Sequence, residues 1–395
     1  MIRILVKRFF TLPDSIRQNP RERSFRYDPD HKMKNTFGTS VTATVFGESH
    51  GPGLGIVLDG IAPGLDVDEN YIRSKLSLRR PTGAISTSRR EPDRFQIISG
   101  VYKGKTTGTP LCITIPNESV RSSDYDSELR IPRPGHADYT GHVKYHGFES
   151  QTGGGHFSGR VTAALVAGGA ILMNALEKKG IQIGTHAARV AGINDAPFTD
   201  LETEVPLLNQ KVFPLLDDEA CKAMKAAILE AAADGDSVGG VLETAVIGMP
   251  AGVGEPWFDS VEGVFAHALY SIPAVKGVEF GDGFAFAELR GSQANDAFGI
   301  ADGKVVTKTN HNGGVLGGIT TGMPIIFRVA VKPTPSIFKE QDSVNLQTMT
   351  PAQLTLCGRH DPAIVHRARA VVDSVTAIVL ADLLAVRYGT DWIAQ

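Results

Sequence analysis

Hydrophobic and polar positions alternate along some segments of the chain and recur at helical spacing along others. Alternating or β-branched segments predict strands at 40–46, 95–99, 111–115, 239–247 and 325–331. Apolar residues at helical spacing predict helices at 68–78, 158–179, 217–233 and 363–388. This irregular mixture, with no repeat of fixed period, predicts an α/β (α+β) fold in a single compact domain.

One long segment, residues 290–322, is polar and rich in glycine and has little periodicity. A loop of that length inside a compact domain is usually functional, so we expect it near a site. The segment 197–214 is the only candidate for an internal domain boundary, and its composition gives weak support for one.

The first 32 residues differ from the rest in charge, with eight basic and four acidic side chains before a second methionine, Met33. Lys7 and Arg8 interrupt the apolar part, and no small-residue cleavage pattern follows, which argues against a signal peptide. We expect residues 1–32 to be a basic extension, flexible or a mis-assigned start, and residues 33–395 to be the functional domain. An ordered arm or a targeting segment is the alternative.

Composition narrows the function classes. With 40 Lys and Arg against 43 Asp and Glu, the net charge of −3 argues against a general nucleic-acid binder. The longest uncharged apolar stretch, 163–176, is too short to span a bilayer, so no membrane partner is expected. Three widely spaced cysteines favour a reducing cytoplasm. The 43 glycines indicate places where backbone approaches a ligand closely.

Positive charge gathers beside turns that contain glycine or proline. Arg79, Arg133, Arg160 and Arg359 occupy four such places, and together they predict a cradle for a polyanion such as a phosphorylated carboxylate. Taken individually, an arginine in such a turn is more often a solvated or salt-bridged surface residue. The triple glycine 153–155, placed before a predicted helix start at Ser158, is either an anion-binding turn or a packed glycine turn.

Two histidines, His50 and His136, lie in glycine-flanked turns, where a side chain is available for acid–base chemistry. His142 and His146 are four residues apart, but no HExxH motif or clear carboxylate ligand accompanies them. No metal is therefore expected. A phosphate-binding metal hydrolase that uses His136, Asp138, His142 and His146 remains the main alternative.

Seven motifs, in order from about Met33 to the C-terminus, resemble those of chorismate synthase. They are GESHG at 47–51, TTGT at 106–109, RPGHAD at 133–138, AVKGV at 274–278, NHNGG at 310–314, KPTPS at 332–336 and GRHDP at 358–362. The resemblance implies the family's β-α-β sandwich and a carbon–oxygen lyase. That lyase eliminates phosphate from 5-enolpyruvylshikimate 3-phosphate, giving chorismate for aromatic amino-acid biosynthesis. It also implies a requirement for reduced FMN without net redox change, and a homotetramer.

The same resemblance implies a role for each matching residue. His50 would be the acid that assists phosphate departure, His136 would protonate the reduced flavin, and Asp361 would accept the substrate proton with the flavin N5 region. The four arginines named above would bind substrate anions, and Arg359 would also lie near FMN. The implied flavin contacts are His156, Phe157, Ser158, Pro273, Ala274, Gly317, Lys332, Pro333, Thr334, Pro335 and Ser336.

Three segments depart from the family pattern. His156 and Phe157 stand where an arginine and a serine are usual, the loop 82–88 lacks an arginine found in many members, and Pro335 replaces a hydroxyl residue. The missing arginine in the loop 82–88 weakens any expectation that the protein reduces its own flavin with NADPH. An external flavin reductase is therefore a candidate partner. An inactive flavin- or phosphate-binding module of the same fold is a further alternative.

Overall fold

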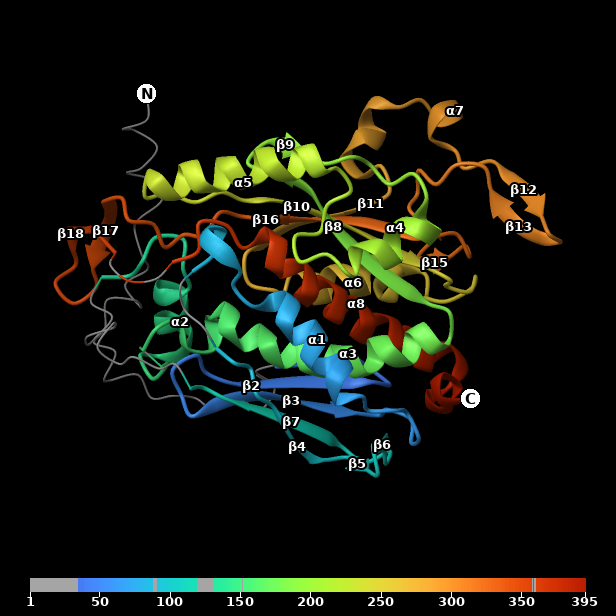
Figure 1. Cartoon of the computed structure of the whole chain (residues 1–395), viewed down its shortest axis with the longest axis horizontal. Coiled ribbons are helices and arrows are strands. Elements are labelled where there is room, and N and C mark those ends of the chain that lie inside the picture. Colours follow the sequence, from blue (N-terminus) through green and yellow to red (C-terminus); the bar gives the residue numbers. More distant parts are fainter. Residues whose placement is uncertain (1–34, 88–90, 119–130, 151, 357, 359) are drawn as a thin grey trace, which may run out of the picture. The chain divides into compact units, whose positions relative to one another are not determined.

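Two five-stranded antiparallel sheets enclose a layer of helices (Figure 1). The computed structural model describes residues 35–87, 91–118, 131–150, 152–356, 358 and 360–395. The first sheet has the order β1-β2-β3-β7-β4, formed by Thr36–Phe37, Thr42–Gly47, Gly53–Asp59, Leu111–Pro116 and Gln96–Ser99. The second has the order β11-β16-β10-β8-β9, formed by Val275–Phe280, Ile325–Val331, Gly240–Ile247, Gln182–Val190 and Ile193–Asn194. Every neighbouring pair in both sheets is antiparallel, so the expected α+β class is confirmed.

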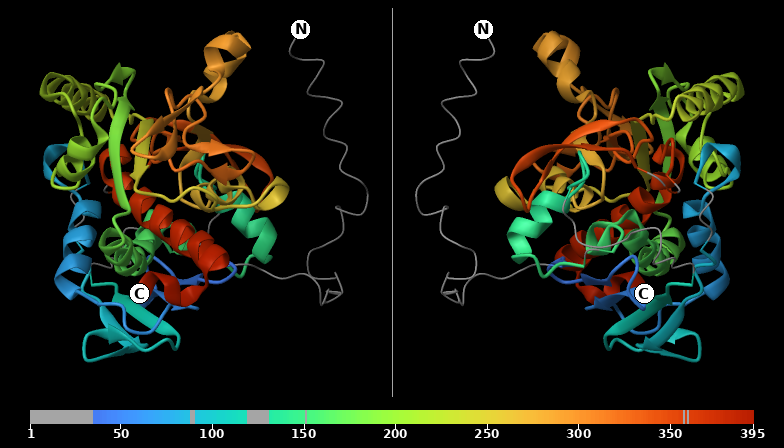
Figure 2. Two further views of the ribbon diagram at one scale, coloured as in Figure 1. Left: turned by 90° about the vertical axis from the view of Figure 1, so that its right-hand side faces the viewer. Right: turned by 90° about the vertical axis from the view of Figure 1, so that its left-hand side faces the viewer.

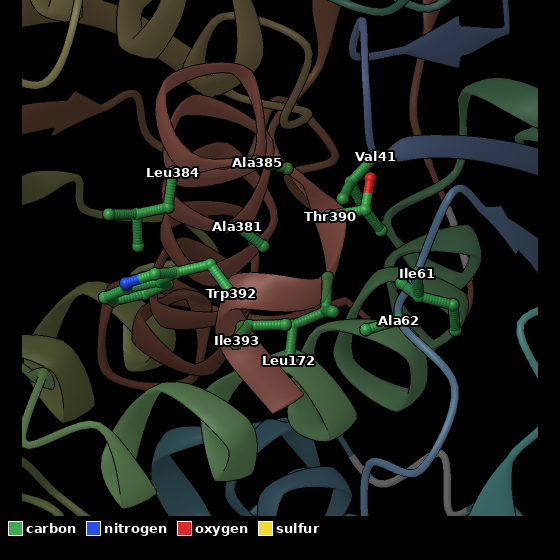
Figure 3. A pocket seen from close by; sticks show the side chains of 11 residues that line it. Val41, Ile61, Ala62, Leu172, Ala381, Leu384, Ala385, Thr390, Trp392 and Ile393 are labelled. Carbon is green, nitrogen blue, oxygen red and sulfur yellow. The ribbon is translucent and has the colours of Figure 1, made fainter. Parts of the chain in front are cut away.

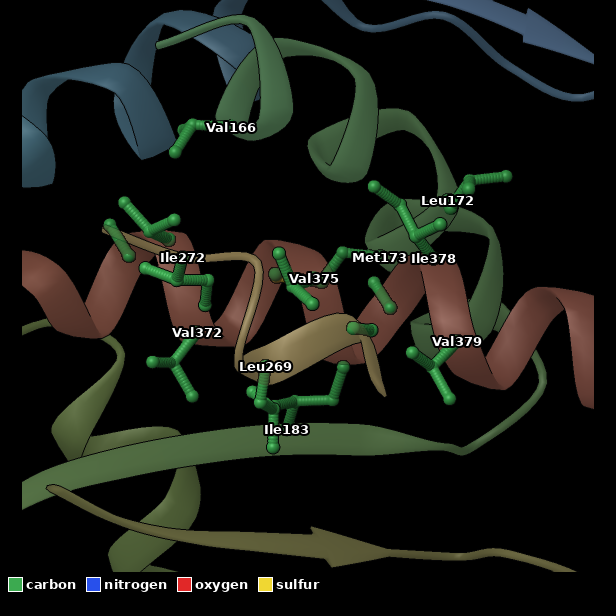
Figure 4. Close-up of a cluster of buried hydrophobic side chains, with 14 of the residues drawn as sticks. Val166, Leu172, Met173, Ile183, Leu269, Ile272, Val372, Val375, Ile378 and Val379 are labelled. Atoms are coloured by element: carbon green, nitrogen blue, oxygen red, sulfur yellow. The ribbon is translucent and has the colours of Figure 1, made fainter. Parts of the chain in front are cut away.

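The middle layer contains the two longest helices, α3 (Thr162–Lys178) and α8 (Val365–Tyr388), which lie against each other. Helices α1 (Glu69–Arg79) and α6 (Val261–Leu269) pack beside them, and Figure 4 shows side chains of α3, α6, α8 and β8 that meet in this core. On the far face of the second sheet, α4 (Leu201–Leu208) covers Ala245 and Ile247 of β10. Most of β8 and the second half of β10 are therefore buried on both faces, whereas β16 alternates buried and half-buried residues.

The apolar segment expected as one helix from Ser158 begins differently. Ser158 caps a 3-10 turn, η7 (Gly159–Val161), and α3 starts only at Thr162. Within the described residues, the stretch Gly159–Lys178 is long and apolar enough to cross a membrane, but 83% of its most apolar window is buried in the protein. It serves here as the central core helix.

The predicted helices begin and end close to the observed ones. Asp68 accepts hydrogen bonds from the first backbone N–H groups of α1, and Asp217 does the same for α5 (Asp218–Ala233). Strand β16 has the predicted bounds. Patterning missed β8, because most of its residues are buried on both faces and their hydrophobicity does not alternate.

The glycine-rich stretch 290–322 is not a structureless loop. It contains α7 (Gly291–Ala294) and two hairpins, β12 (Phe298–Ala301) with β13 (Lys304–Thr307) and β14 (Val315–Leu316) with β15 (Ile319–Thr320). In Figures 1 and 2 the orange segment that carries α7 projects away from the second sheet. The other short elements are α2 (Asp138–Tyr145), β5 (Val101–Tyr102), β6 (Lys105–Thr106), β17 (Gln341–Asn345), β18 (Thr350–Leu354), η4 (Gly83–Ile85), η6 (Gly155–Phe157), η8 (Trp257–Asp259), η9 (Gly283–Glu288) and η10 (Thr390–Ala394).

The C-terminal end of α8 closes the fold against the first sheet. Asp382 accepts hydrogen bonds from the backbone N–H groups of Thr39, Ser40 and Val41, at 2.9, 2.7 and 2.9 Å. A void of about 10 Å³ remains beside Val41 and Trp392 (Figure 3). Such a volume holds about one water at most, so it is not a ligand site.

Candidate active site

A cavity of about 670 Å³ lies beside the first turns of α3 and α8, at their left-hand ends in Figure 1. Loops from the whole length of the chain line it, including the turn after β2, the end of α1, the turn before β11 and the loop after β16. The volume is that of a small-molecule or cofactor site, for which about 300–1,000 Å³ is usual. Because the N-terminal ends of two buried helices face it, the cavity favours anions.

His50 reaches the cavity from the turn that follows β2. Its Nδ1 lies 3.0 Å from Ser49 Oγ, and Ser49 is fully buried. The ring also lies against Gly153, where an added Cβ would come within 2.3 Å of the imidazole. A glycine at 153, with φ of +67°, is therefore required by the position of His50.

His136 comes from the turn before α2 and lines the same cavity. Its Nε2 is 2.6 Å from Ser336 Oγ, in the loop after β16. Burial and the neighbouring positive charge of Arg133 lower the pKa of His136 to about 4. The imidazole is thus neutral near pH 7 in the ligand-free protein.

Asp361 is held at both carboxylate oxygens. The backbone N–H of Thr87 donates to Oδ1 at 3.0 Å, and the Arg367 guanidinium donates to Oδ2. Both partners line the cavity. Motif matching identified Asp361 but missed Arg367, although an arginine in the first turn of a helix, where the dipole disfavours it, could have indicated a site.

Arg79 and Arg160 meet at one carboxylate that the sequence analysis did not select. Asp93, 2% exposed, pairs with Arg160 and lies 3.7 Å from Arg79 and 3.6 Å from Arg80. Its own φ of +51° is unusual for a residue with a side chain. Glu91, 4.0 Å from Arg160, is a second acidic partner, so two carboxylates face three guanidinium groups and the cluster keeps a net positive charge. The only sign of Asp93 in the sequence was the charged segment 91–94 in which it lies.

Arg133 is fixed within its own turn. Its Nε and Nη2 donate to the two carboxylate oxygens of Asp138, both at 2.7 Å, and Nη2 also donates to Gly153 O at 3.0 Å. A bidentate pair of this kind sets the orientation of the guanidinium precisely. The hydrogen bond to Gly153 O also joins the turn that carries His136 to the triple glycine that lies against His50.

Most of the flavin contacts implied by the resemblance line the same cavity. They are His156, Phe157, Ser158, Pro273, Ala274, Lys332, Thr334, Pro335 and Ser336. Gly317 lies in the exposed turn between β14 and β15 and Pro333 is also exposed, and neither lines the cavity. Arg359 falls outside the described residues. The stretch 290–322, expected near the site, contributes no described residue to its lining.

Two observations fit a polar cofactor in this part of the cavity. Thr334 Oγ1 is buried and has no hydrogen-bond partner among the described residues, so a ligand could supply one. Ala274, which lines the cavity in the turn before β11, has φ of +77°, a strained conformation for a residue with a side chain. Lys332 Nζ donates to Gly135 O at 2.6 Å, which ties this loop to the His136 turn.

The departures from the family pattern have clear local contacts. His156 Nδ1 lies 2.8 Å from Gly47 O, so the imidazole bridges η6 and the end of β2. The Phe157 ring packs on Gly141 of α2, where a Cβ would come within 2.8 Å of it, and lies 6.0 Å from the Tyr145 ring. Phe157 therefore packs against α2 in this structure.

Charge decides what the cavity can bind. Among its described lining residues, six are cationic (Arg79, Arg133, Arg160, Lys276, Lys332 and Arg367) and four are anionic (Glu91, Asp93, Asp138 and Asp361). The excess of positive charge, with half-buried imidazoles beside it, suits a substrate with several negative groups and an acid–base reaction.

The residues of the alternative metal site do not converge. His142 Nδ1 is 3.1 Å from Glu149 Oε1, whereas His136 contacts Ser336 and Asp138 is held by Arg133. Among the described residues, no group of three or more His, Cys, Asp and Glu side chains is arranged to hold a metal ion.

Comparisons with known proteins agree on one family. The family model described as chorismate synthase matches residues 41–385. Chorismate synthase of Pyrococcus abyssi is 47% identical over 350 residues, covering 89% of this chain and 97% of the relative. That of Dehalococcoides mccartyi is 46% identical over 358 residues, covering 90% and 98%. A crystal structure of chorismate synthase matches with a TM-score of 0.72 at 31% identity, covering 90% of this chain and 95% of that one.

Proposed function

The chain belongs to the chorismate synthase family, and we propose that the 670 Å³ cavity is where it forms chorismate. The family reaction is the 1,4-elimination of phosphate from 5-enolpyruvylshikimate 3-phosphate, a lyase step in the shikimate pathway to aromatic amino acids. One observation carries the proposal: His50, His136 and Asp361, from three distant parts of the chain, line a single cavity with an excess of positive charge.

His50 is the proposed acid for the leaving group. As the carbon–oxygen bond to phosphate breaks, negative charge grows on the bridging oxygen, and a proton from the imidazole would offset it. Ser49 at Nδ1 orients the ring, and Gly153 gives it room.

Asp361 is the proposed base for the substrate proton at C6, acting with the flavin N5 region. Its two fixed hydrogen bonds, from Thr87 and Arg367, orient the carboxylate before substrate binds.

The arginines are proposed to bind the substrate's phosphate and carboxylate groups. Arg79 and Arg160 belong to a cluster in which Asp93 and Glu91 face three guanidinium groups, so a net positive charge remains for an anion. Arg133, fixed by Asp138, presents its guanidinium in a set orientation, and Arg359 is proposed for the same role.

Reduced FMN is the proposed cofactor, within the flavin requirement of the family. When bound, it supplies electron density to the allylic system without net redox change. Thr334, Ser336 and Lys332 would hold it on one side, and the Pro273–Ala274 turn on another. His136 would hold a proton at the flavin: an anionic ligand would offset the charge of Arg133 and Lys332 and so raise the pKa of His136 from its ligand-free value.

We propose a homotetramer located in the cytoplasm, with an external flavin reductase as a candidate partner. Residues 33–395 are the proposed catalytic domain, and residues 1–32 a basic extension outside it. The family match at 41–385 supports this division.

The test is an anaerobic assay with 5-enolpyruvylshikimate 3-phosphate and photoreduced FMN, following chorismate absorbance and released phosphate together. We expect equal amounts of both products and no net flavin oxidation. His50→Ala and His136→Ala should each lower turnover by about a hundredfold. Flavin binding without product would support an inactive module, and product formation that depends on added Zn²⁺ or Mn²⁺ would favour the hydrolase. Repeating the assay with oxidised FMN and NADPH tests self-reduction.

A further inference from the structure

A buried histidine lies directly behind the proposed base and is not part of the cavity lining. We propose that His366 is a positioning residue which, through Ser86 and Thr87, fixes the carboxylate of Asp361. This inference rests on the proposed function, in which Asp361 takes the substrate proton.

His366 belongs to the first turn of α8, whose other face lines the cavity with Ile364, Arg367, Ala368 and Val371. Its side chain points away from that face and is 2% exposed. The imidazole stacks on the Phe213 ring, with centroids 5.3 Å apart and planes 6° from parallel. Substrate therefore cannot reach His366, and the ring orientation is fixed by packing.

A short chain of contacts leads from His366 to Asp361. His366 Nε2 lies 2.9 Å from Ser86 Oγ, which holds the end of the segment that follows η4. The next residue, Thr87, lines the cavity and donates its backbone N–H to Asp361 Oδ1 at 3.0 Å. Asp361 and His366 are five residues apart in the chain, so these contacts close a ring that links the η4 segment to the start of α8.

Packing alone does not account for a histidine at this position. Burial, together with the charge of Arg367, lowers the pKa of His366 to about 4, so the ring is neutral near pH 7. Its Nδ1 has no hydrogen-bond partner within the part of the chain that the structure describes. A buried unsatisfied polar atom destabilises the fold, and phenylalanine at the same place would avoid that cost. The Ser86 contact is what the histidine provides in return.

The contact matters because Ser86 directly precedes Thr87 in the chain, so the hydrogen bond to His366 fixes the backbone at the residue that donates to Asp361. Gly83 and Ala84 are exposed, and Ile85 is the buried residue of the turn. Without the Ser86–His366 hydrogen bond, Thr87 N–H can move relative to Asp361, and one of the two contacts that orient the carboxylate is weakened. A displacement of about 1 Å at a reacting group can cost about a hundredfold in rate.

The test uses the full chain in the anaerobic chorismate assay. His366→Phe keeps the stack on Phe213 but removes the hydrogen bond, and Ser86→Ala removes it from the other side. We expect each to lower kcat by about ten- to a hundredfold with little change in KM. His366→Gln, whose amide nitrogen can take the place of Nε2, should recover much of the loss. Ser77→Ala, which removes an exposed hydroxyl on α1, is the control and should retain wild-type turnover.

A cycle with Asp361→Asn separates positioning from general structural damage. If His366 acts through Asp361, adding His366→Phe to Asp361→Asn should cause no further loss of kcat. Multiplicative losses in that double variant, or wild-type kcat in both His366→Phe and Ser86→Ala, would overturn the inference while leaving the proposed function intact. Wild-type turnover by Asp361→Asn would instead remove the base from the proposed function, and this inference with it. Absence of product from the unmodified protein would reject the proposed function itself.

Discussion

At the scale of single residues, the site depends on close approaches that leave no room for change. The imidazole of His50 lies against the Cα of Gly153, and Arg133 donates to the carbonyl of that same glycine. The proposed acid His50, the proposed substrate-binding residue Arg133 and the glycine turn are therefore in direct contact. Changes to the backbone here should affect chemistry more than folding.

Gly153→Ala tests this packing. A Cβ at 153 would come within 2.3 Å of the His50 ring and would be placed at a φ of +67°, so we expect His50 to be displaced and kcat to fall by about a hundredfold. Steady-state kinetics of the elimination measure the change. Gly291→Ala, where the added Cβ meets nothing within 4 Å, is the matched control. Wild-type kcat in a folded Gly153→Ala protein would contradict the assignment of His50.

His136 should take up a proton when anionic ligands bind. Its pKa of about 4 reflects burial and the charge of Arg133, and a bound anion would oppose the second cause. At about pH 5.5, calorimetric titration of substrate in two buffers of different ionisation enthalpy should show proton uptake. The uptake should disappear in His136→Ala and persist in His267→Ala, which alters a histidine outside the cavity lining. Equal heats in both buffers would show that His136 stays neutral.

At the scale of elements, two helices decide where the functional turns lie. The first turns of α3 and α8 face the cavity, so any shift of either helix moves Arg160 or Arg367. The far end of α8 is held by Asp382, whose carboxylate receives three backbone N–H groups from the turn between β1 and β2. That contact joins the middle layer to the first sheet.

Asp382→Ala should lower the free energy of unfolding by about 3 kcal/mol, because it leaves three partly buried N–H groups without their acceptor. Urea denaturation followed by circular dichroism measures the change. Asp391→Ala, a nearby exposed carboxylate in η10, should change it by less than about 0.5 kcal/mol. A loss in Asp382→Ala no larger than in the control would show that water replaces the carboxylate.

At the scale of the whole molecule, buried histidines make stability depend on pH in two directions. Burial alone would lower the pKa of His186, but hydrogen bonds to Asp195 and Glu243 raise it. The contribution of His186 to the free energy of unfolding is therefore complete below pH 6.5, and it is lost as the pH rises through the folded-state pKa. His136 and His366 have folded-state pKa values of about 4. Their contributions to the free energy of unfolding are present above pH 6.5 and are lost as the pH falls toward 4.

His366→Phe should therefore reduce the acid sensitivity of the fold. Between pH 7 and pH 5 the unfolded chain protonates a histidine that the folded protein keeps neutral, which costs the wild type about 2 kcal/mol at this residue. The free energy of unfolding of His366→Phe should therefore fall by about 2 kcal/mol less than that of the wild type between pH 7 and pH 5, as measured by urea denaturation at each pH. Ser77→Ala, which changes no titratable group, should follow the wild type. Parallel losses in all three proteins would show that His366 is protonated in the folded state.

The sequence by itself determined the elements with a clear local cause and the motifs that identify the family. Asp68 and Asp217 cap helices where predicted, and β16 has its predicted bounds, because capping and alternation act within a few residues. The motifs also named His50, His136 and Asp361. Their proposed roles rest on that resemblance.

Only the tertiary structure decided which of those residues meet. Asp93, Arg367, Ser86 and His366 had no motif of their own, since their significance comes from partners that are distant in the chain or on another element. The same is true of the stretch 290–322, whose hairpins form by pairing rather than by periodicity and carry it away from the cavity. Local patterns depend on neighbours in the chain, whereas a site depends on side chains that folding brings together from separate loops.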